Sequence, residues 1–200
     1  GNADKLAEFM AEVEALGMKA LGPDVNQSDT DFTPVVKDNA IRFGLGAIKG
    51  VGEQAARNIV AEREKNGPFK DFADFVGRMG ETDLNARTLD CLVRAGAFDF
   101  TGEDRRHLVD SIESVRRHFA GERKERASGQ GSLFDLLGAE DAGAARPTDL
   151  ILRKSEKMPR LEMLNGEKSL LGFYLSGHPL ADYHGLDEAV ATLSVTPDRI

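Results

Sequence analysis

The stretch that decides the fold of this chain is Leu45-Gly46-Ala47-Ile48-Lys49-Gly50-Val51-Gly52-Glu53-Gln54-Ala55-Ala56-Arg57-Asn58-Ile59-Val60. It predicts a short helical turn, a tight hairpin around Gly50 and Gly52, and a longer helix. Glycine permits the positive φ angles or close approaches that a sharp hairpin needs. Glu53 falls in the first turn of the longer helix, where a negative charge suits the helix dipole.

A hairpin of this kind leaves backbone N–H groups pointing outward at a helix N-terminus, and such groups bind phosphate oxygens without reading base sequence. Lys49 adds a positive charge beside them. The pattern resembles the helix-hairpin-helix motif of DNA-binding proteins, with Lys49 where that motif often has proline. An ordinary helical corner built on two glycines remains the alternative. The candidate DNA-binding residues are Lys49, Gly50, Val51, Gly52 and Gln54.

Composition limits the class of protein. The net charge of −8 argues against a surface coated with nucleic-acid-binding groups, but residues 41–70 carry six Lys and Arg against three Glu. The single cysteine, Cys91, excludes an internal disulfide and fits a reducing compartment. No apolar run approaches the ~20 residues of a membrane span. We therefore expect a cytoplasmic protein with no membrane partner.

The predicted fold is mainly α: a tandem helix-hairpin-helix domain with a small β-hairpin, followed by a flexible linker and a C-terminal helical segment. An amphipathic helix near the start marks residues 1–31 as a lead-in or the end of a preceding domain. The domain itself is expected over residues 32–120. It opens with strands at Phe32–Val36 and Ala40–Leu45, joined by a turn.

The second helical unit of the domain, residues 69–97, lacks a Gly-x-Gly hairpin, so we assign it to packing. Asn85 is the expected N-cap of its second helix, and Gly96 the glycine at that helix's end. Aromatic side chains near nucleic acid can stack on bases, but helical spacing favours core packing here. The apolar face consists of Phe72, Phe75, Val76 and Met79.

Two further groups of charged residues have less specific patterns. Asp29 and Asp31 stand at a spacing that can hold a metal, but no third ligand accompanies them, which favours a solvated turn. A helix over residues 104–119 carries arginines off its apolar face, and a solvated helix face is favoured over DNA contact. These arginines are Arg105, Arg106, Arg116 and Arg117.

Residues 121–149 change in composition to Gly, Ala and charge, as in a flexible linker. An apolar island at residues 130–137 has no core of its own to join. It can dock back onto the domain or be held out for a partner. Residues 150–200 form the C-terminal segment, with a helix expected from about Arg160 to Tyr174 and an approach to a following domain.

Four blocks together are similar to one family, the DNA polymerase III alpha subunit of bacterial replication, in the region after its fingers. The order and spacing of the blocks match, and the resemblance covers nearly the whole chain. The blocks begin with Ala40-Ile41-Arg42-Phe43-Gly44, Gly67-Pro68-Phe69, Leu84-Asn85 and Leu171-Gly172-Phe173-Tyr174.

The resemblance implies a second binding site. Gln130, Leu133 and Phe134 match the family's internal peptide for the sliding clamp. It also implies that the parent chain is a DNA-directed DNA polymerase that uses Mg²⁺, with its catalytic carboxylates upstream of this region. Asp29 and Asp31 do not correspond to those carboxylates, so no catalysis and no cofactor are expected here. The implied partners are double-stranded DNA, the sliding clamp and the other polymerase domains.

Two alternatives remain open from the sequence. Helix-hairpin-helix units also occur in DNA repair nucleases and ligases, although neither catalytic carboxylates nor an active-lysine motif is present. A pure protein-interaction module, whose glycine hairpin is only a turn, is favoured somewhat by the negative net charge.

Overall fold

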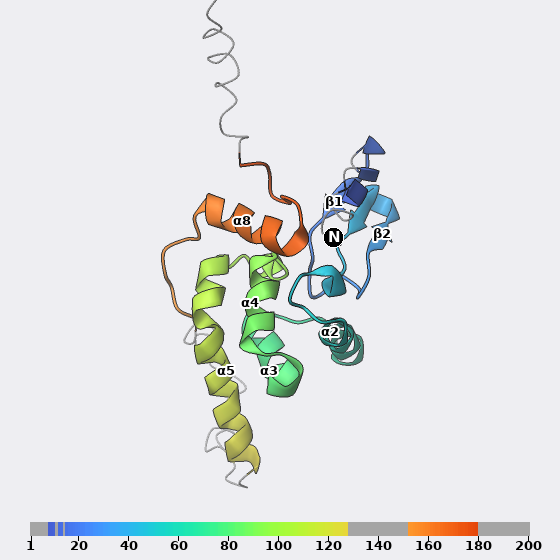
Figure 1. Ribbon diagram of the computed structural model, residues 1–200. Helices are drawn as coiled ribbons and strands as arrows, with labels where there is room; N and C mark the ends of the chain where they lie inside the picture. Colours follow the sequence, from blue (N-terminus) through green and yellow to red (C-terminus); the bar gives the residue numbers. More distant parts are fainter. Residues whose placement is uncertain (1–7, 11, 14, 128–151, 180–200) are drawn as a thin grey trace, which may run out of the picture.

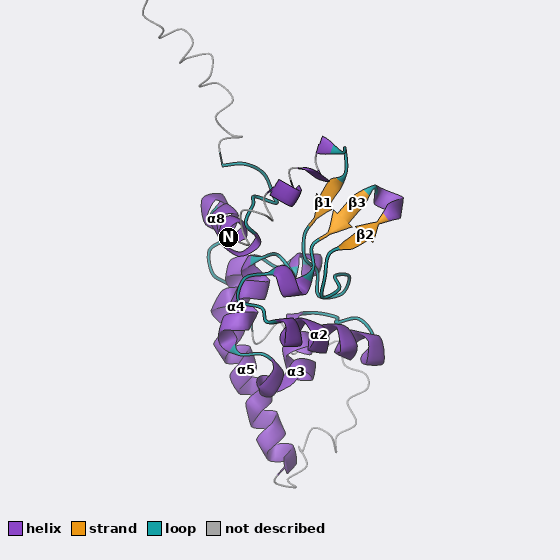
Figure 2. Cartoon of the chain, turned by 45° about the vertical axis from the view of Figure 1, so that its right-hand side comes forward, coloured by secondary structure: helices purple, strands orange, loops and turns teal. Residues whose placement is uncertain are grey.

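The computed structural model describes residues 8–10, 12–13, 15–127 and 152–179 (Figure 1). Within these ranges the chain is mainly helical, as predicted, with a small sheet to one side of the helices (Figure 2). Helix α5 is the longest helix, and α8 crosses the ends of α4 and α5 (Figure 1). Residues 8–10, 12–13 and 15, which belong to the predicted lead-in helix, are helical.

The sheet has three strands in the order β1-β3-β2, where only two were predicted. Strands β2 (Thr33–Val35) and β3 (Ala40–Arg42) form the predicted antiparallel hairpin, with Pro34 opposite Ile41. Strand β1 (Lys19–Leu21) pairs in parallel with β3. Pro34 lies on an edge strand, where proline is tolerated. The short 3₁₀ turn η1 (Val36–Asp38) joins β2 to β3.

The decisive stretch folds as its sequence predicts. A single 3₁₀ turn, η2 (Leu45–Ala47), precedes the hairpin, and α2 (Glu53–Asn66) follows it. Helix α2 ends at Gly67, whose φ of 82° is one that other residues rarely adopt. Ala56 and Ile59 provide the buried face of α2.

The second unit consists of α3 (Phe72–Asp83) and α4 (Ala86–Arg94). The Asn85 side chain accepts a hydrogen bond from the Thr88 amide, which confirms the predicted N-cap. Phe72 and Phe75 each lie edge-to-face against Phe98, with ring centroids 5.1 and 4.9 Å apart. Phe69 packs on Phe75 at 4.8 Å. The phenylalanines therefore build the core, as predicted, and the turn η3 (Asp99–Thr101) follows it.

Helix α5 (Arg105–Ala127) is longer than predicted. Residues 121–127 were assigned to the linker but are helical, which corrects the linker's start. They are rich in Glu, Arg, Lys and Ala, all of them good helix formers. Arg123 also reaches the carbonyl oxygens of Val76 and Gly77 on α3. Local propensity and this contact together extend α5.

The loop of residues 24–31, predicted to precede the domain, is part of it. Val25 and Ser28 are fully buried. The Asn26 side chain exchanges two hydrogen bonds with the backbone of Phe69, at 2.7 and 2.9 Å. Arg63 of α2 donates to the Val25 and Ser28 carbonyls. The predicted boundary at residue 32 therefore lies too late in the chain.

Helix α8 (Arg160–Leu171) also packs on the helical body, so the described part of the C-terminal segment is not a separate unit. Leu171 is fully buried in the core. Beside it, the fully buried Glu167 carboxylate accepts hydrogen bonds from Arg105 and from the Leu175 and Ser176 amides. Arg105 in turn holds Asp99 at 2.6 Å. These bonds fix α8 and the turn after it against α5.

None of the helices in the described residues is both long and apolar enough to span a membrane.

Replacing Glu167 by alanine tests how α8 is held. Arg105, only 5% exposed, would keep Asp99 but lose its buried partner. We expect Glu167→Ala to lower the free energy of unfolding by about 3 kcal/mol, because the buried guanidinium loses its buried carboxylate partner and the Leu175 and Ser176 amides lose their acceptor. The measurement is urea denaturation followed by circular dichroism. Glu162→Ala removes a partly exposed carboxylate from the same helix, so its loss stays below about 1 kcal/mol. Equal losses in the two variants would contradict this.

Candidate nucleic-acid interface

The two glycines of the hairpin have different roles. Gly50 has a φ of +90°, and a Cβ atom there would lie 2.7 Å from Cys91 Sγ on α4. The fold therefore requires glycine at this position. Gly52 has an ordinary φ of −71°, and a Cβ atom there would meet nothing within 4 Å. The missing side chain of Gly52 instead leaves the N-terminus of α2 uncovered.

The backbone amides of the hairpin divide into two sets. The Val51 amide donates to the Ile48 carbonyl, and the Lys49 amide donates to Leu170 O on α8, each at 3.0 Å. Gly52 is the N-cap of α2, and Glu53, Gln54 and Ala55 form its first turn. The amides of these four residues, and that of Gly50, have no acceptor within the described part of the chain. Of the predicted hairpin residues, Lys49 and Val51 thus have amides that are already taken, and the open amides lie mainly at the N-cap and in the first turn of α2.

The side chains of the predicted site also differ from one another in exposure and in partners. Lys49 is exposed and has no ion pair among the described residues. Val51 is 4% exposed, so it anchors the hairpin in the core. The Gln54 side chain donates to Asn58, and Glu53 pairs with Arg57 at 2.5 Å. Lys49 is therefore the cation available to a ligand at the hairpin.

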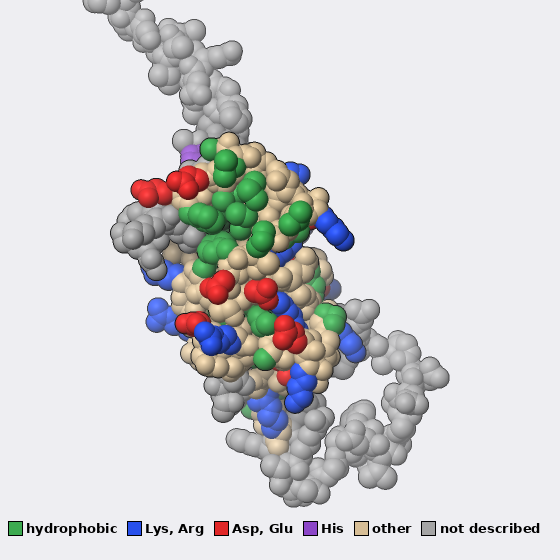
Figure 3. Space-filling view, turned by 90° about the vertical axis from the view of Figure 1, so that its right-hand side faces the viewer, with side chains coloured by type: hydrophobic (Ala, Val, Ile, Leu, Met, Phe, Trp, Pro, Cys, Tyr) green, Lys and Arg blue, Asp and Glu red, His purple; other side chains and the backbone are tan. Residues whose placement is uncertain are grey.

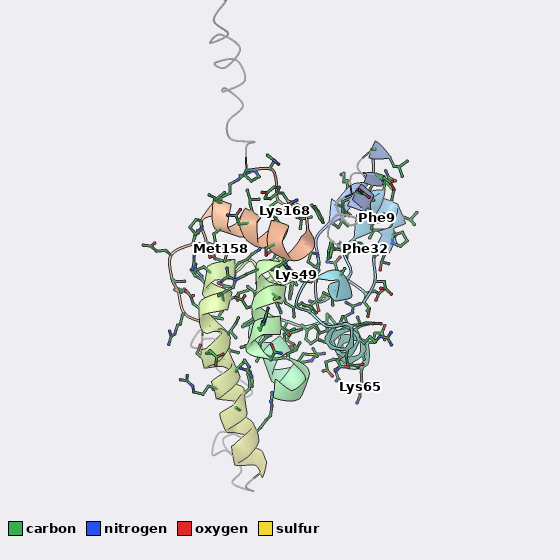
Figure 4. The ribbon with its side chains drawn as sticks, viewed as in Figure 1. Phe9, Phe32, Lys49, Lys65, Met158 and Lys168 are labelled. Carbon is green, nitrogen blue, oxygen red and sulfur yellow. The ribbon has the colours of Figure 1, made fainter. Side chains whose placement is uncertain are left out.

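A groove with a volume of about 830 Å³ lies between the hairpin and the C-terminal end of α8. Lys49 and Lys168 both line it, on opposite elements (Figure 4). Phe9 and Phe32 line its sheet side. A view of the sheet and α2 shows hydrophobic side chains gathered over the upper part and charges of both signs over the lower part (Figure 3). The groove thus carries lysines at its rim and apolar side chains in its wall.

Three other charged residues singled out in the sequence, Asp29, Arg105 and Arg106, have internal partners. Asp29 pairs with Arg63 at 3.1 Å, and no three His, Cys, Asp or Glu side chains gather into a metal site in the described ranges. Arg105 is buried and Arg106 pairs with Glu162 of α8, so neither forms the solvated face that was predicted. The helical periodicity of a sequence does not predict such partners, because they lie far away along the chain.

Two further features singled out in the sequence are Cys91 and the predicted clamp peptide. Burial raises the pKa of the Cys91 thiol, which keeps it protonated and suited to packing against the hairpin. Gln130, Leu133 and Phe134 lie outside the described residues.

Comparison with known proteins now bears on this geometry. The profile of the helix-hairpin-helix motif family matches residues 17–108. The chain is 38% identical to the DNA polymerase III subunit alpha of Deinococcus radiodurans over 95% of its own length. It is 42% identical to that of Thermus aquaticus over 95%, and 40% identical to that of Caulobacter vibrioides over 92%. The chain belongs to the DNA polymerase III alpha family.

It corresponds to one segment of that family's proteins, because it spans only 14–15% of the length of these relatives. The match to the helix-hairpin-helix profile begins at residue 17, at the edge of the sheet, rather than at the predicted residue 32. Both the profile and the packing of the loop at residues 24–31 against α2 and Phe69 thus place the sheet and loop with the hairpin. In this chain, the region matched by the helix-hairpin-helix profile packs around an aromatic core.

Replacing each of the two glycines by alanine tests whether their roles differ. Gly50→Ala is expected to lower the free energy of unfolding by about 1–3 kcal/mol, because a side chain is strained at this φ and clashes with Cys91. Gly52→Ala is the matched control, with an expected loss below about 1 kcal/mol, because its φ is ordinary and the space is open. Thermal and chemical denaturation measure both. A larger loss in Gly52→Ala would show that the hairpin is held differently.

Proposed function

We propose that this segment of a polymerase III alpha subunit holds duplex DNA by its phosphate backbone through the glycine hairpin. One observation carries the proposal. Four consecutive amides, those of Gly52, Glu53, Gln54 and Ala55, have no acceptor in the described part of the chain, and the exposed Lys49 lies beside them. Helix N-termini with open amides are suited to phosphate. The names of the relatives and the matched motif support the same ligand.

The binding is independent of base sequence, because amides and a lysine contact phosphate oxygens and no group in the hairpin is placed to read base edges. Affinity then depends steeply on salt, since each phosphate contact releases counterions. The net charge of −8 does not oppose this role, because it is the local charge at the hairpin that meets the DNA. The buried Val51 and the Lys49 amide bond to Leu170 keep the hairpin rigid before DNA arrives.

We further propose that Gln130, Leu133 and Phe134 bind the sliding clamp. The support is the sequence: a polar Gln and adjacent Leu-Phe anchors within a Gly- and charge-rich stretch, at the position where the family resemblance places its clamp peptide. A clamp contact and a DNA contact on one chain reinforce each other, because each raises the effective concentration of the other partner. Two weak contacts thereby hold the polymerase on DNA.

The parent chain is proposed to be a DNA-directed DNA polymerase of the cytoplasm, with its catalytic carboxylates and Mg²⁺ outside this segment. Asp29 does not fit a metal-ligand role, since its carboxylate is held by Arg63. The role proposed for this segment is binding, and its partners include the other polymerase domains.

The protein-interaction module is the alternative that a specific observation favours, since the groove beside the hairpin has apolar walls. It predicts no affinity for plain duplex at any salt concentration. The repair-enzyme alternative has less support, because the relatives named above are polymerase subunits.

Reversing the charge at the hairpin tests the DNA contact. Lys49→Glu is expected to weaken duplex binding by at least about tenfold for all sequences alike, because it replaces a phosphate contact by repulsion. Fluorescence anisotropy with two duplexes of unrelated sequence measures this. Lys65→Glu, at the far end of α2, is the matched control (Figure 4). Unchanged affinity in Lys49→Glu would remove the hairpin from the interface.

Truncating the peptide anchors tests the clamp contact. Leu133→Ala combined with Phe134→Ala is expected to abolish clamp binding, because apolar anchors carry most of the energy of such contacts. Isothermal calorimetry with a purified sliding clamp is the measurement. Duplex affinity and the thermal unfolding temperature serve as controls and stay unchanged. Clamp affinity equal to that of the unaltered chain would refute the assignment.

A further inference from the structure

The groove between the hairpin and α8 has a charge pattern unlike that of the chain as a whole. The chain contains 34 Asp and Glu against 26 Lys and Arg. Among the described residues, the groove is nevertheless lined by no Asp or Glu, and the two charged residues that line it, Lys49 and Lys168, are both positive. Two lysines that line one groove of an acidic chain, with no carboxylate among the described lining residues, present a local site for an anion.

Helix α8 is held rigidly at this groove. Its Leu170 carbonyl accepts the Lys49 amide of the hairpin at 3.0 Å. Glu167, the residue before Lys168, is fully buried and accepts hydrogen bonds from Arg105, Leu175 and Ser176. The backbone that carries Lys168 is therefore fixed relative to the backbone that carries Lys49.

The C-terminal end of a helix carries partial negative charge, which on its own would repel a polyanion. At α8 this negative charge is partly compensated. The Leu170 carbonyl is taken by the hairpin amide, and the Gly172 carbonyl accepts Lys168 Nζ at 2.8 Å. Lys168 is exposed, and its Nζ also lies 5.6 Å from the centroid of the Tyr174 ring. Its ammonium group has three donors, so it retains donors for a ligand.

We propose that the DNA-binding surface continues from the hairpin across the groove onto α8, where Lys168 supplies a second backbone-phosphate contact alongside Lys49. The proposal rests on the proposed function, since the ligand is the same duplex. It adds to the interface a helix that lies outside the matched motif at residues 17–108. The hairpin and α8 then form one phosphate-binding surface, joined by the bond between Lys49 and Leu170.

The test is a salt titration of duplex affinity with the 200-residue chain, using fluorescence anisotropy. Lys168→Gln is expected to lower affinity about five- to tenfold and to reduce the slope of log affinity against log salt by about one, as for the loss of one phosphate contact. Lys168→Arg is expected to keep both. Lys49→Gln gives a similar loss, and the double variant loses about two units of slope, because the contacts are separate. Lys65→Gln is the matched control for removal of one exposed lysine.

The outcomes separate this proposal from the one on which it rests. A loss in Lys49→Gln with none in Lys168→Gln would overturn the α8 contact and leave the hairpin contact standing. No duplex binding by the unaltered chain would overturn both. A Lys168→Gln variant that unfolds at a lower temperature but binds duplex with unchanged affinity and slope would show that Lys168 only caps its helix, and would likewise overturn the α8 contact. Loss of slope at an unchanged unfolding temperature supports it.

Discussion

One buried guanidinium, that of Arg105, connects parts of the chain that are distant in sequence. It binds Asp99 at 2.6 Å, the Arg94 carbonyl at the end of α4, and Glu167 of α8 at 3.1 Å. Although burial opposes its charge, Asp99 and Glu167 raise the pKa of Arg105, so the group stays ionised. Gly96 allows this contact, because a Cβ atom there would lie 2.5 Å from the guanidinium.

The position of α8 depends on this ion pair, and the hairpin in turn touches α8. Glu167 holds the turn after α8 by accepting hydrogen bonds from the Leu175 and Ser176 amides. The Leu170 carbonyl accepts a hydrogen bond from the Lys49 amide. A buried charge network is weak evidence for net stability, but removing one partner of a buried ion pair is costly. The network therefore specifies where α8 lies. As a result, the lysine beside the glycine hairpin is oriented by residues more than one hundred positions later in the chain.

The local features of the fold could be predicted well. Asn85 caps α4, Gly67 ends α2, and Phe72 and Phe75 lie on one buried face, because each depends on residues within a turn or two of helix. The features that were missed depend on distant partners. Strand β1 pairs with β3, Asn26 binds the Phe69 backbone, and Arg105 meets Glu167. No periodicity in the sequence marks such pairs.

The features of the candidate site likewise fall into those that depend on nearby residues and those that depend on distant ones. The sequence by itself determined that a tight glycine hairpin precedes a helix and that Lys49 stands beside it, because backbone φ preferences and helix caps act over a few residues. Only the tertiary structure decided that Gly50 is required by Cys91 while Gly52 faces open space, that Val51 is buried, and that the Lys49 amide is taken by α8. These outcomes depend on which segments pack together. Such packing is set by the whole core rather than by any one stretch of the chain.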